Sequence, residues 1–319
     1  MIDLLHHESG IHALDAGYFR PQLAAIYLIV ERGRVAVVDT ATNACLPRVL
    51  AALQTLGLSP AGVDYVVPTH VHLDHAGGAG AMMQVFSEAR LVVHPRGARH
   101  MIDPTALFAA VQAVYGEAKA HRLYGEPVPV SPDRIIAAAD GHALDLGGRT
   151  LICLDTPGHA RHHLSLLDTR SGGMFVGEAF GLSLRELDIE SRPSILPAIA
   201  PTQFDPVAMR ASVERILSHR PPVLYLAHFG RVRDAPRLGG DLLRLLDAQV
   251  VLAERERDAG PARGARLLAG LWAQVEIEAA RQGWRLAAEP LHALLDEYLE
   301  LNAQALDGWL TQTASSEKS

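Results

Sequence analysis

The stretch THVHLDHAGG, residues 69–78, places three imidazoles and one carboxylate within six positions. It follows an apolar run typical of a strand, so His70 and His72, two residues apart, point to the same side and can reach one cation. Asp74 and His75 follow in a turn whose small residues let the backbone curl into a helix, so this pair faces a neighbouring point. Imidazole and carboxylate ligands suit Zn²⁺ and similar divalent ions. The stretch therefore predicts the beginning of a metal site at a strand end.

Strand and helix signals alternate on both sides of this stretch. Two β-branched apolar runs, 23–32 and 34–40, flank a tight turn and predict a hairpin, and a helix is expected at 46–56. A strand at 64–69 leads into the histidines, and a helix at 76–86 follows them. This alternation predicts an α/β layered domain. Further strands are expected at 89–95, 149–156, 162–169, 172–178 and 222–228, and another helix at 206–219.

Two parts of the chain depart from this rhythm. Residues 101–146 begin with a helical pattern and continue into a proline-rich connection, which predicts a helical insert that can serve as a wall or lid. Residues 234–319 are helical in pattern, with apolar residues repeating along one face of each helix. We therefore expect a catalytic domain at 1–233 and a helical extension at 234–319. The extension either packs on that domain or supplies the surface of a homodimer.

The composition narrows the class of protein. With 49% hydrophobic residues in 319, the chain can build a substantial core, and no stretch approaches the roughly 20 apolar residues of a membrane helix. The formal net charge of -7 and the scattered arginines argue against a nucleic-acid partner. The two cysteines, Cys45 and Cys153, are expected to be core residues in a reducing compartment. We therefore expect a cytoplasmic protein that acts on a small molecule, with no membrane partner.

The chain contains 16 histidines, a high number that makes a metal the first hypothesis to test. A complete site needs more ligands than residues 69–78 supply. His159 follows a strand and a Thr-Pro-Gly turn, and His228 follows the last predicted strand. Between these two histidines in the sequence, Glu178 follows another predicted strand and a glycine. Each of these side chains is held by a rigid element, which makes it a candidate ligand.

The order of these motifs, HxHxDH, then TPGH, then a carboxylate after FVG, then a histidine at a strand end, resembles the metallo-β-lactamase superfamily over roughly residues 10–230. The resemblance implies a four-layer αββα sandwich with two metal ions, most simply zinc, with iron and manganese as alternatives. The implied ligands are His70, His72 and His159 for one ion, Asp74, His75 and His228 for the second, and Glu178 as the bridge between them.

The sequence departs from the family pattern at the bridging position, where the family usually has Asp and this chain has Glu178. The extra methylene displaces the carboxylate by about one bond length, and metal geometry tolerates little misplacement. Three outcomes are therefore open for Glu178. It bridges both ions, it binds one ion, or the second metal site is lost. The resemblance also suggests that Asp39 lies beneath the metals and accepts a hydrogen bond from a ligand imidazole.

The function that this resemblance implies is hydrolysis by a metal-bound hydroxide, with Asp74 as the catalytic group that orients the hydroxide and shuttles its proton. The substrate is expected to be small and ester-like, a thioester or a lactone. A non-haem iron oxidoreductase, similar to the sulfur dioxygenases of the same fold, is the alternative, since a weakened bridge suits a single-iron site. The flavodiiron branch carries Glu where this chain has His72, and true β-lactamases usually carry Cys or Ser, not a carboxylate, near the second metal.

Other histidines carry weaker signals. His163 is expected to begin a strand, with its neighbour His162 turned toward the cleft or solvent. His94, His100 and His121 are candidates for lining a substrate pocket, although a single histidine of this kind is more often structural.

Overall fold

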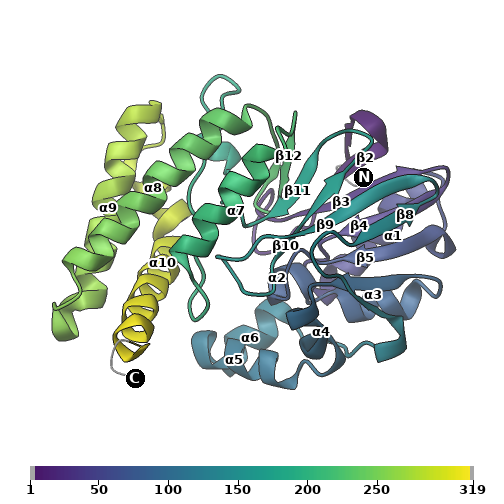
Figure 1. Cartoon of the computed structure of the whole chain (residues 1–319), viewed down its shortest axis with the longest axis horizontal. Coiled ribbons are helices and arrows are strands. Elements are labelled where there is room, and N and C mark those ends of the chain that lie inside the picture. Colours follow the sequence, from purple (N-terminus) through teal and green to yellow (C-terminus); the bar gives the residue numbers. More distant parts are fainter. Residues whose placement is uncertain (1–3, 317–319) are drawn as a thin grey trace. The chain divides into compact units, whose positions relative to one another are not determined.

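The computed structural model describes residues 4–316, which form two compact units. One unit, here called the sheet unit, comprises residues 4–155, 162–177 and 221–233. The other, here called the helical unit, comprises residues 156–161, 178–220 and 234–316. Figure 1 labels the elements of both. No helix within residues 4–316 combines the length and the apolar character needed to cross a membrane.

The sheet unit contains a seven-stranded sheet in which the strands follow chain order, β1-β2-β3-β4-β5-β6-β7. The first four strands pair antiparallel, and β4 to β7 pair parallel, because helices connect them. Strands β1, β2 and β7 were not expected from the sequence. The bounds are β1 Leu4–His7, β2 Ile11–Asp15, β3 Ala25–Glu31, β4 Arg34–Val38, β5 Val63–Val67, β6 Arg90–Val93 and β7 Ile135–Ala137.

The second sheet has six strands in the order β13-β12-β11-β10-β9-β8, all antiparallel except the pair β11 and β12. The predicted strands near Cys153, Leu166, Phe175 and Tyr225 all lie in it. Neither β8 nor β13 was expected. The bounds are β8 Ala143–Leu146, β9 Arg149–Asp155, β10 Leu164–Asp168, β11 Met174–Gly177, β12 Leu224–Leu226 and β13 Gly230–Val232.

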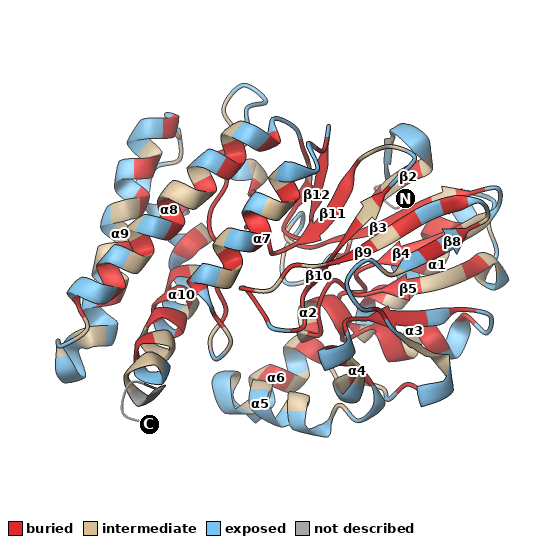
Figure 2. Ribbon diagram, in the orientation of Figure 1, coloured by how far each residue is buried: buried red, intermediate tan, exposed pale blue. Residues whose placement is uncertain are grey.

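Alternating residues of the first sheet serve two different cores. Leu28 and Val37 face one way and pack with Leu53 of a covering helix, whereas Tyr27 faces the other way and packs with Phe175 of the second sheet. The central strands β3 and β4 are accordingly buried along most of their length, whereas the edge strands β1 and β7 are not (Figure 2). The predicted α/β sandwich is confirmed in this arrangement of two mixed sheets with helices. The helices of this unit are α1 Leu46–Thr55, α2 Leu73–Ala76, α3 Ala79–Val85, α4 Pro95–Ile102, α5 Thr105–Tyr115 and α6 Glu117–Tyr124.

The range 101–146 is helical only in its first half. Helices α5 and α6 fit the predicted insert, but regular helix ends at Tyr124. Beyond it, β7 and β8 are strands of the two sheets. The proline-rich connection concealed both strands, because proline and glycine interrupt the period-two pattern by which strands are recognised. The two cysteines are buried as predicted, and burial raises the pKa of Cys153 to about 12.

The helical unit contains α7 Pro206–Ser218, α8 Ala235–Arg255, α9 Arg263–Gln282 and α10 Ala288–Ser316. Helix α7 starts with an Asp205 cap, whose carboxylate accepts hydrogen bonds from the next turn of backbone, followed by Pro206 at the first position. Helices α8, α9 and α10 pack against one another (Figure 1). The predicted apolar face of α8 is confirmed, since these residues are all buried: Leu242, Leu245, Leu246, Gln249 and Leu252.

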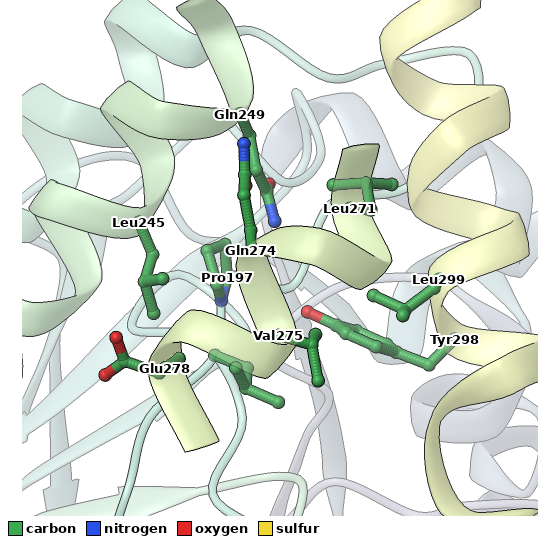
Figure 3. A pocket seen from close by; sticks show the side chains of 10 residues that line it. Pro197, Leu245, Gln249, Leu271, Gln274, Val275, Glu278, Tyr298 and Leu299 are labelled. Atoms are coloured by element: carbon green, nitrogen blue, oxygen red, sulfur yellow. The ribbon is translucent and has the colours of Figure 1, made fainter. Parts of the chain in front are cut away.

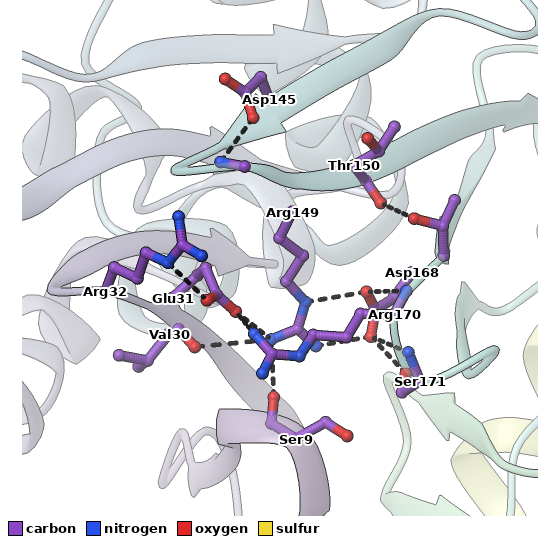
Figure 4. Close-up of polar contacts among 12 residues, drawn as sticks. Ser9, Val30, Glu31, Arg32, Asp145, Arg149, Thr150, Asp168, Arg170 and Ser171 are labelled. Atoms are coloured by element: carbon purple, nitrogen blue, oxygen red, sulfur yellow. Dashed lines mark hydrogen bonds and ion pairs between the residues drawn. The ribbon is translucent and has the colours of Figure 1, made fainter.

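A buried ionic network joins several segments of the sheet unit (Figure 4). Arg149 at the start of β9 forms a two-pronged pair with Asp168 at the end of β10, with Nε to Oδ1 at 2.8 Å and Nη2 to Oδ2 at 2.5 Å. Its Nη1 also donates to the carbonyl of Ser9 at 2.6 Å. Both ionic side chains are almost fully buried, with Glu31 and Arg170 at the margin of the network. The guanidinium thus joins three segments that are remote in sequence.

Candidate metal centre

The histidine motif follows β5, which ends at Val67, as the sequence predicted. The predicted helix at 76–86 is α3, Ala79–Val85, but the expected turn at Asp74 and His75 is instead the short helix α2, Leu73–Ala76. His72 is the residue before the first helical turn, so Asp74 and His75 lie within a helix of four residues while His70 remains on the loop. Gly78 makes the tight curl possible, because a side chain there would press against the backbone carbonyls of Thr40 and Thr42. The histidine cluster is therefore built on backbone that the body of the sheet unit holds closely.

Asp74, His75 and His228 converge within the sheet unit. One ligand atom from each lies within 4.8 Å of the others. Oδ2 of Asp74 is 3.2 Å from Nε2 of His75 and 3.5 Å from Nε2 of His228. Two ligands of one tetrahedral zinc ion are about 3.3 Å apart, given metal–ligand distances of about 2.0–2.1 Å. The spacing of these three groups therefore fits a shared divalent ion.

Backbone contacts orient these imidazoles. His228 follows β12, and its Nδ1 is 2.9 Å from the carbonyl of Leu23. Because a carbonyl can only accept, Nδ1 carries a proton, and Nε2 is the ring nitrogen that faces Asp74. His75 is held through its own carbonyl, which accepts hydrogen bonds from N and Oγ1 of Thr40 at 2.7 and 2.8 Å. His228 therefore directs Nε2 toward the site, as a metal-binding histidine requires, and the backbone of His75 is held in place.

A second set of contacts runs from Asp39 to His72. Asp39 accepts hydrogen bonds from N and Oγ1 of Thr69 at 2.7 and 3.0 Å. The Thr69 hydroxyl in turn lies 3.2 Å from Nδ1 of His70, whose Nε2 is 2.9 Å from Nδ1 of His72. Asp39 therefore reaches His70 through Thr69, and its closest approach to His75 is 3.6 Å. Thr69 was not singled out from the sequence, where it reads as an ordinary strand-end residue.

His159 and Glu178 meet within the helical unit. Nδ1 of His159 is 2.9 Å from the carbonyl of Ala198, which again places the proton on Nδ1. Nε2 then faces Oε2 of Glu178 at 3.0 Å, and both side chains are buried. Two acceptor atoms at this distance repel each other unless a proton or a cation lies between them. The pair thus has the chemistry of a cation site, with Glu178 able to act as a ligand despite its extra methylene.

The remaining candidate histidines lie in the sheet unit, and none belongs to either of the two groups of metal-ligating side chains found among the described residues. His162 is buried rather than turned to solvent, and its Nδ1 accepts from the backbone N–H of Val71 at 3.4 Å. His163 is fully buried beside the start of β10, as expected. His94 is 3.3 Å from Asp155.

Tyr124 at the end of α6 is a functional candidate that sequence reasoning missed. Burial, strengthened by the nearby Asp74 carboxylate, raises the pKa of its hydroxyl well above the usual value. Its ring lies against Tyr18, with 6.0 Å between centroids, and Tyr115 is at the same distance on another side. Tyr115 and Tyr124 are visible in the sequence as two tyrosines nine residues apart. No local sequence pattern, however, links Tyr124 to Asp74.

Gly158 in the TPGH turn is expected to be essential for the placement of His159. Its φ is +130°, and a Cβ there would collide with the backbone of Met209 in α7. Gly158→Ala is therefore expected to lower the free energy of unfolding by about 2 kcal/mol, with a loss of bound metal. Thermal unfolding and elemental analysis would measure both. Gly240→Ala is the matched control, since a Cβ at this helical position meets nothing, and equal behaviour of the two variants would contradict the prediction.

Comparisons with known proteins agree with this architecture. The family model of the metallo-beta-lactamase superfamily matches residues 20–228. The metallo-beta-lactamase fold-containing protein ST1585 of Sulfurisphaera tokodaii is 25% identical over 228 residues, 70% of this chain and 79% of its own. The N-acyl homoserine lactonase AttM of Azorhizobium caulinodans is 27% identical over 168 residues, 52% of this chain and 59% of its own.

A solved structure extends the likeness of fold to nearly the whole chain. The metallo-beta-lactamase family protein TTHA1429 from Thermus thermophilus has a TM-score of 0.65 and 23% identity, with 96% of this chain and 94% of that chain covered. The family model alone spans well over half of the sequence. The chain therefore belongs to the metallo-beta-lactamase superfamily.

Proposed function

We propose that this protein is a metal-dependent hydrolase of a small ester-like substrate, a thioester or a lactone. The observation that carries the proposal is the convergence of Asp74, His75 and His228 at separations of 3.2 and 3.5 Å, with the His228 tautomer set by Leu23. Such separations match the ligand set of one divalent ion. Membership of a superfamily with a hydrolase-like, metal-binding fold supports the same reaction class.

The proposal assigns the ligands as the motif order suggests. Asp74, His75 and His228 would hold one ion. His70 and His72 would hold the other together with His159. Glu178 would bind beside His159, where its carboxylate already lies at 3.0 Å. The chemistry of this donor set, five imidazoles and two carboxylates without a thiolate, suits zinc and also admits iron or manganese.

Each part of the site would contribute differently to the reaction. Bound divalent ions lower the pKa of a water molecule toward neutrality and polarise the substrate carbonyl. Asp74 has a side chain that is 23% exposed, whereas the side chains of His75 and His228 are 1% and 9% exposed. The Asp74 carboxylate is therefore the group that an incoming water and substrate reach. We expect it to orient the attacking water and to accept its proton.

The choice of an ester-like bond is supported by one relative, the N-acyl homoserine lactonase AttM, whose name gives a lactone as its substrate. The alternative, a single-iron oxidoreductase, predicts different cofactors and a need for oxygen. Retention of His72, where the flavodiiron branch has Glu, favours hydrolysis over that branch.

Metal removal and replacement would test the proposal. The protein is purified without added metal, analysed for bound elements, stripped with a chelator and reloaded with zinc, manganese or ferrous iron. Hydrolysis of thioesters and lactones is then followed by titrating the acid released. We expect activity to disappear on stripping and to return with two zinc ions per chain. Chelator-resistant hydrolysis would refute the proposal, and oxygen uptake with one iron per chain would establish the oxidoreductase instead.

A further inference from the structure

Residues 193–202 of the helical unit, here called the orienting segment, carry the carbonyl that His159 uses. This carbonyl belongs to Ala198, which is 2% exposed, and lies 2.9 Å from Nδ1 of the imidazole. The same segment exchanges two backbone hydrogen bonds of 2.9 Å between Leu196 and Leu182. Leu182 is four residues beyond Glu178, so the segment supports both members of the His159–Glu178 pair.

The side chains that fix the orienting segment come from the C-terminal helices. Arg237 of α8 donates to the carbonyl of Pro193 at 2.9 Å. Trp284, between α9 and α10, donates from Nε1 to Oγ of Ser194 at 2.7 Å. Two weaker contacts come from α10, namely Asn302 to the carbonyl of Pro197 at 3.5 Å and Gln312 to the carbonyl of Thr202 at 3.2 Å.

Packing adds to these polar contacts. Leu196 and Pro197 of the orienting segment line a cavity of about 10 Å³, room for one water molecule, together with residues of all three helices (Figure 3). The Tyr298 ring enters from α10 with its hydroxyl toward this space (Figure 3). Burial raises the pKa of Tyr298 above its usual range, and the charge of Glu178 adds to this shift.

We propose that the C-terminal helices position the His159–Glu178 pair for metal binding through the orienting segment, with Trp284 as a positioning residue that touches neither ligand. The carbonyl of Ala198 selects the tautomer that leaves the Nε2 lone pair of His159 available. A partner of this kind raises the basicity of a ligand imidazole and fixes its ring. Movement of residues 193–198 would weaken that contact, and the bond from Trp284 to Ser194 opposes such movement.

The test uses the full chain and cobalt as a spectroscopic probe. Trp284→Phe removes the Nε1 donor and keeps an aromatic ring, while Ser194→Ala removes the acceptor. Metal-free protein is titrated with Co²⁺ while its visible absorption is followed, and zinc affinity is measured by competition with a chelating dye. Loss of a direct outer partner of a ligand costs about 10- to 100-fold in metal affinity, so for this more distant bond we expect weakening of about 3- to 10-fold in one binding step.

The matched control is Trp272→Phe. Trp272 belongs to the same unit and is similarly half-buried. Its ring stacks on that of His292, with 3.8 Å between the ring centroids, and it donates no hydrogen bond to the orienting segment. Weakened binding in Trp284→Phe and Ser194→Ala, with the control unchanged, would support the inference. Wild-type affinity in either variant, or equal weakening in Trp272→Phe, would overturn it. The inference rests on the proposed metal site. If the wild-type chain binds no metal, both the proposed function and this inference are wrong. If the wild type binds metal and hydrolyses substrate, and the variants bind metal equally well, this inference alone is wrong.

Discussion

Asp74→Asn is expected to lower kcat/KM for thioester or lactone hydrolysis by on the order of 10³-fold or more. The substitution keeps the size and shape of the side chain but removes its charge and its ability to accept a proton. Both roles assigned to Asp74, ligand and proton acceptor, depend on the ionised carboxylate. Oδ2 of Asp74 lies 3.2 and 3.5 Å from Nε2 of His75 and of His228. An amide at this position is therefore also expected to weaken binding of the ion that these groups would share.

The measurement combines kinetics with metal content and thermal unfolding. Asp64→Asn is the matched control, since Asp64 lies on β5, outside the histidine motif, and its Oδ2 accepts a hydrogen bond from Nε of Arg34 at 2.8 Å. We expect the control to retain wild-type turnover. An Asp74→Asn protein that is folded and turns over normally would remove Asp74 from the mechanism, whatever the metal content proves to be.

Arg149→Ala is expected to lower the free energy of unfolding by about 3–5 kcal/mol, because it leaves the carboxylate of Asp168 buried without its partner. Asp168 is fully buried, and Arg149 supplies both prongs of the ion pair as well as a bond to Ser9 (Figure 4). Denaturant unfolding would measure the loss. Arg170→Ala removes a half-exposed arginine from the same network and should cost no more than about 1 kcal/mol.

The pH dependence of stability provides an independent check of this pair. Burial alone would raise the pKa of Asp168, but the hydrogen bonds and charge of Arg149, with a bond from Ser171, hold it below its usual value. A carboxyl whose pKa is lower in the folded chain adds stability above its unfolded pKa of about 3.9 and loses it as the pH falls further. The difference in free energy of unfolding between wild type and Arg149→Ala should therefore be largest near neutral pH and should become smaller below about pH 4. A gap that does not change with pH would show that lost packing, not lost charge, causes the effect.

The sequence was informative wherever a side chain itself carried the signal. The strands around Tyr27, Val37, Leu166 and Tyr225 have regular apolar patterns, and each lies where it was expected. The histidines at strand ends were recognised because loops after buried strands commonly carry functional groups. The strands that the sequence did not reveal include β1, with the sequence LLHH, and the three-residue β7 and β13, which are too short to show a period.

The groups that orient the ligands could not be read from the sequence. The carbonyls of Leu23 and Ala198 receive the Nδ1 protons of His228 and His159, and every residue type carries the same carbonyl. Their role depends on where the backbone runs after folding. The contact of Thr69 with Asp39 and His70 likewise becomes visible only when residues 39 and 69 are brought together by neighbouring strands.

The chain changes between its two units five times, after residues 155, 161, 177, 220 and 233. His159 and Glu178 belong to the helical unit although they lie inside the matched family region, 20–228. The C-terminal helices therefore do not form a separate domain that a single junction divides from the rest of the chain. Cutting the chain at residue 233 would separate two earlier segments from the rest of their unit, and the buried side chains of residues 194–200 would lose the helices on which they pack. The C-terminal helices and the loops that carry His159 and Glu178 therefore form one folding unit that no single cut can divide cleanly.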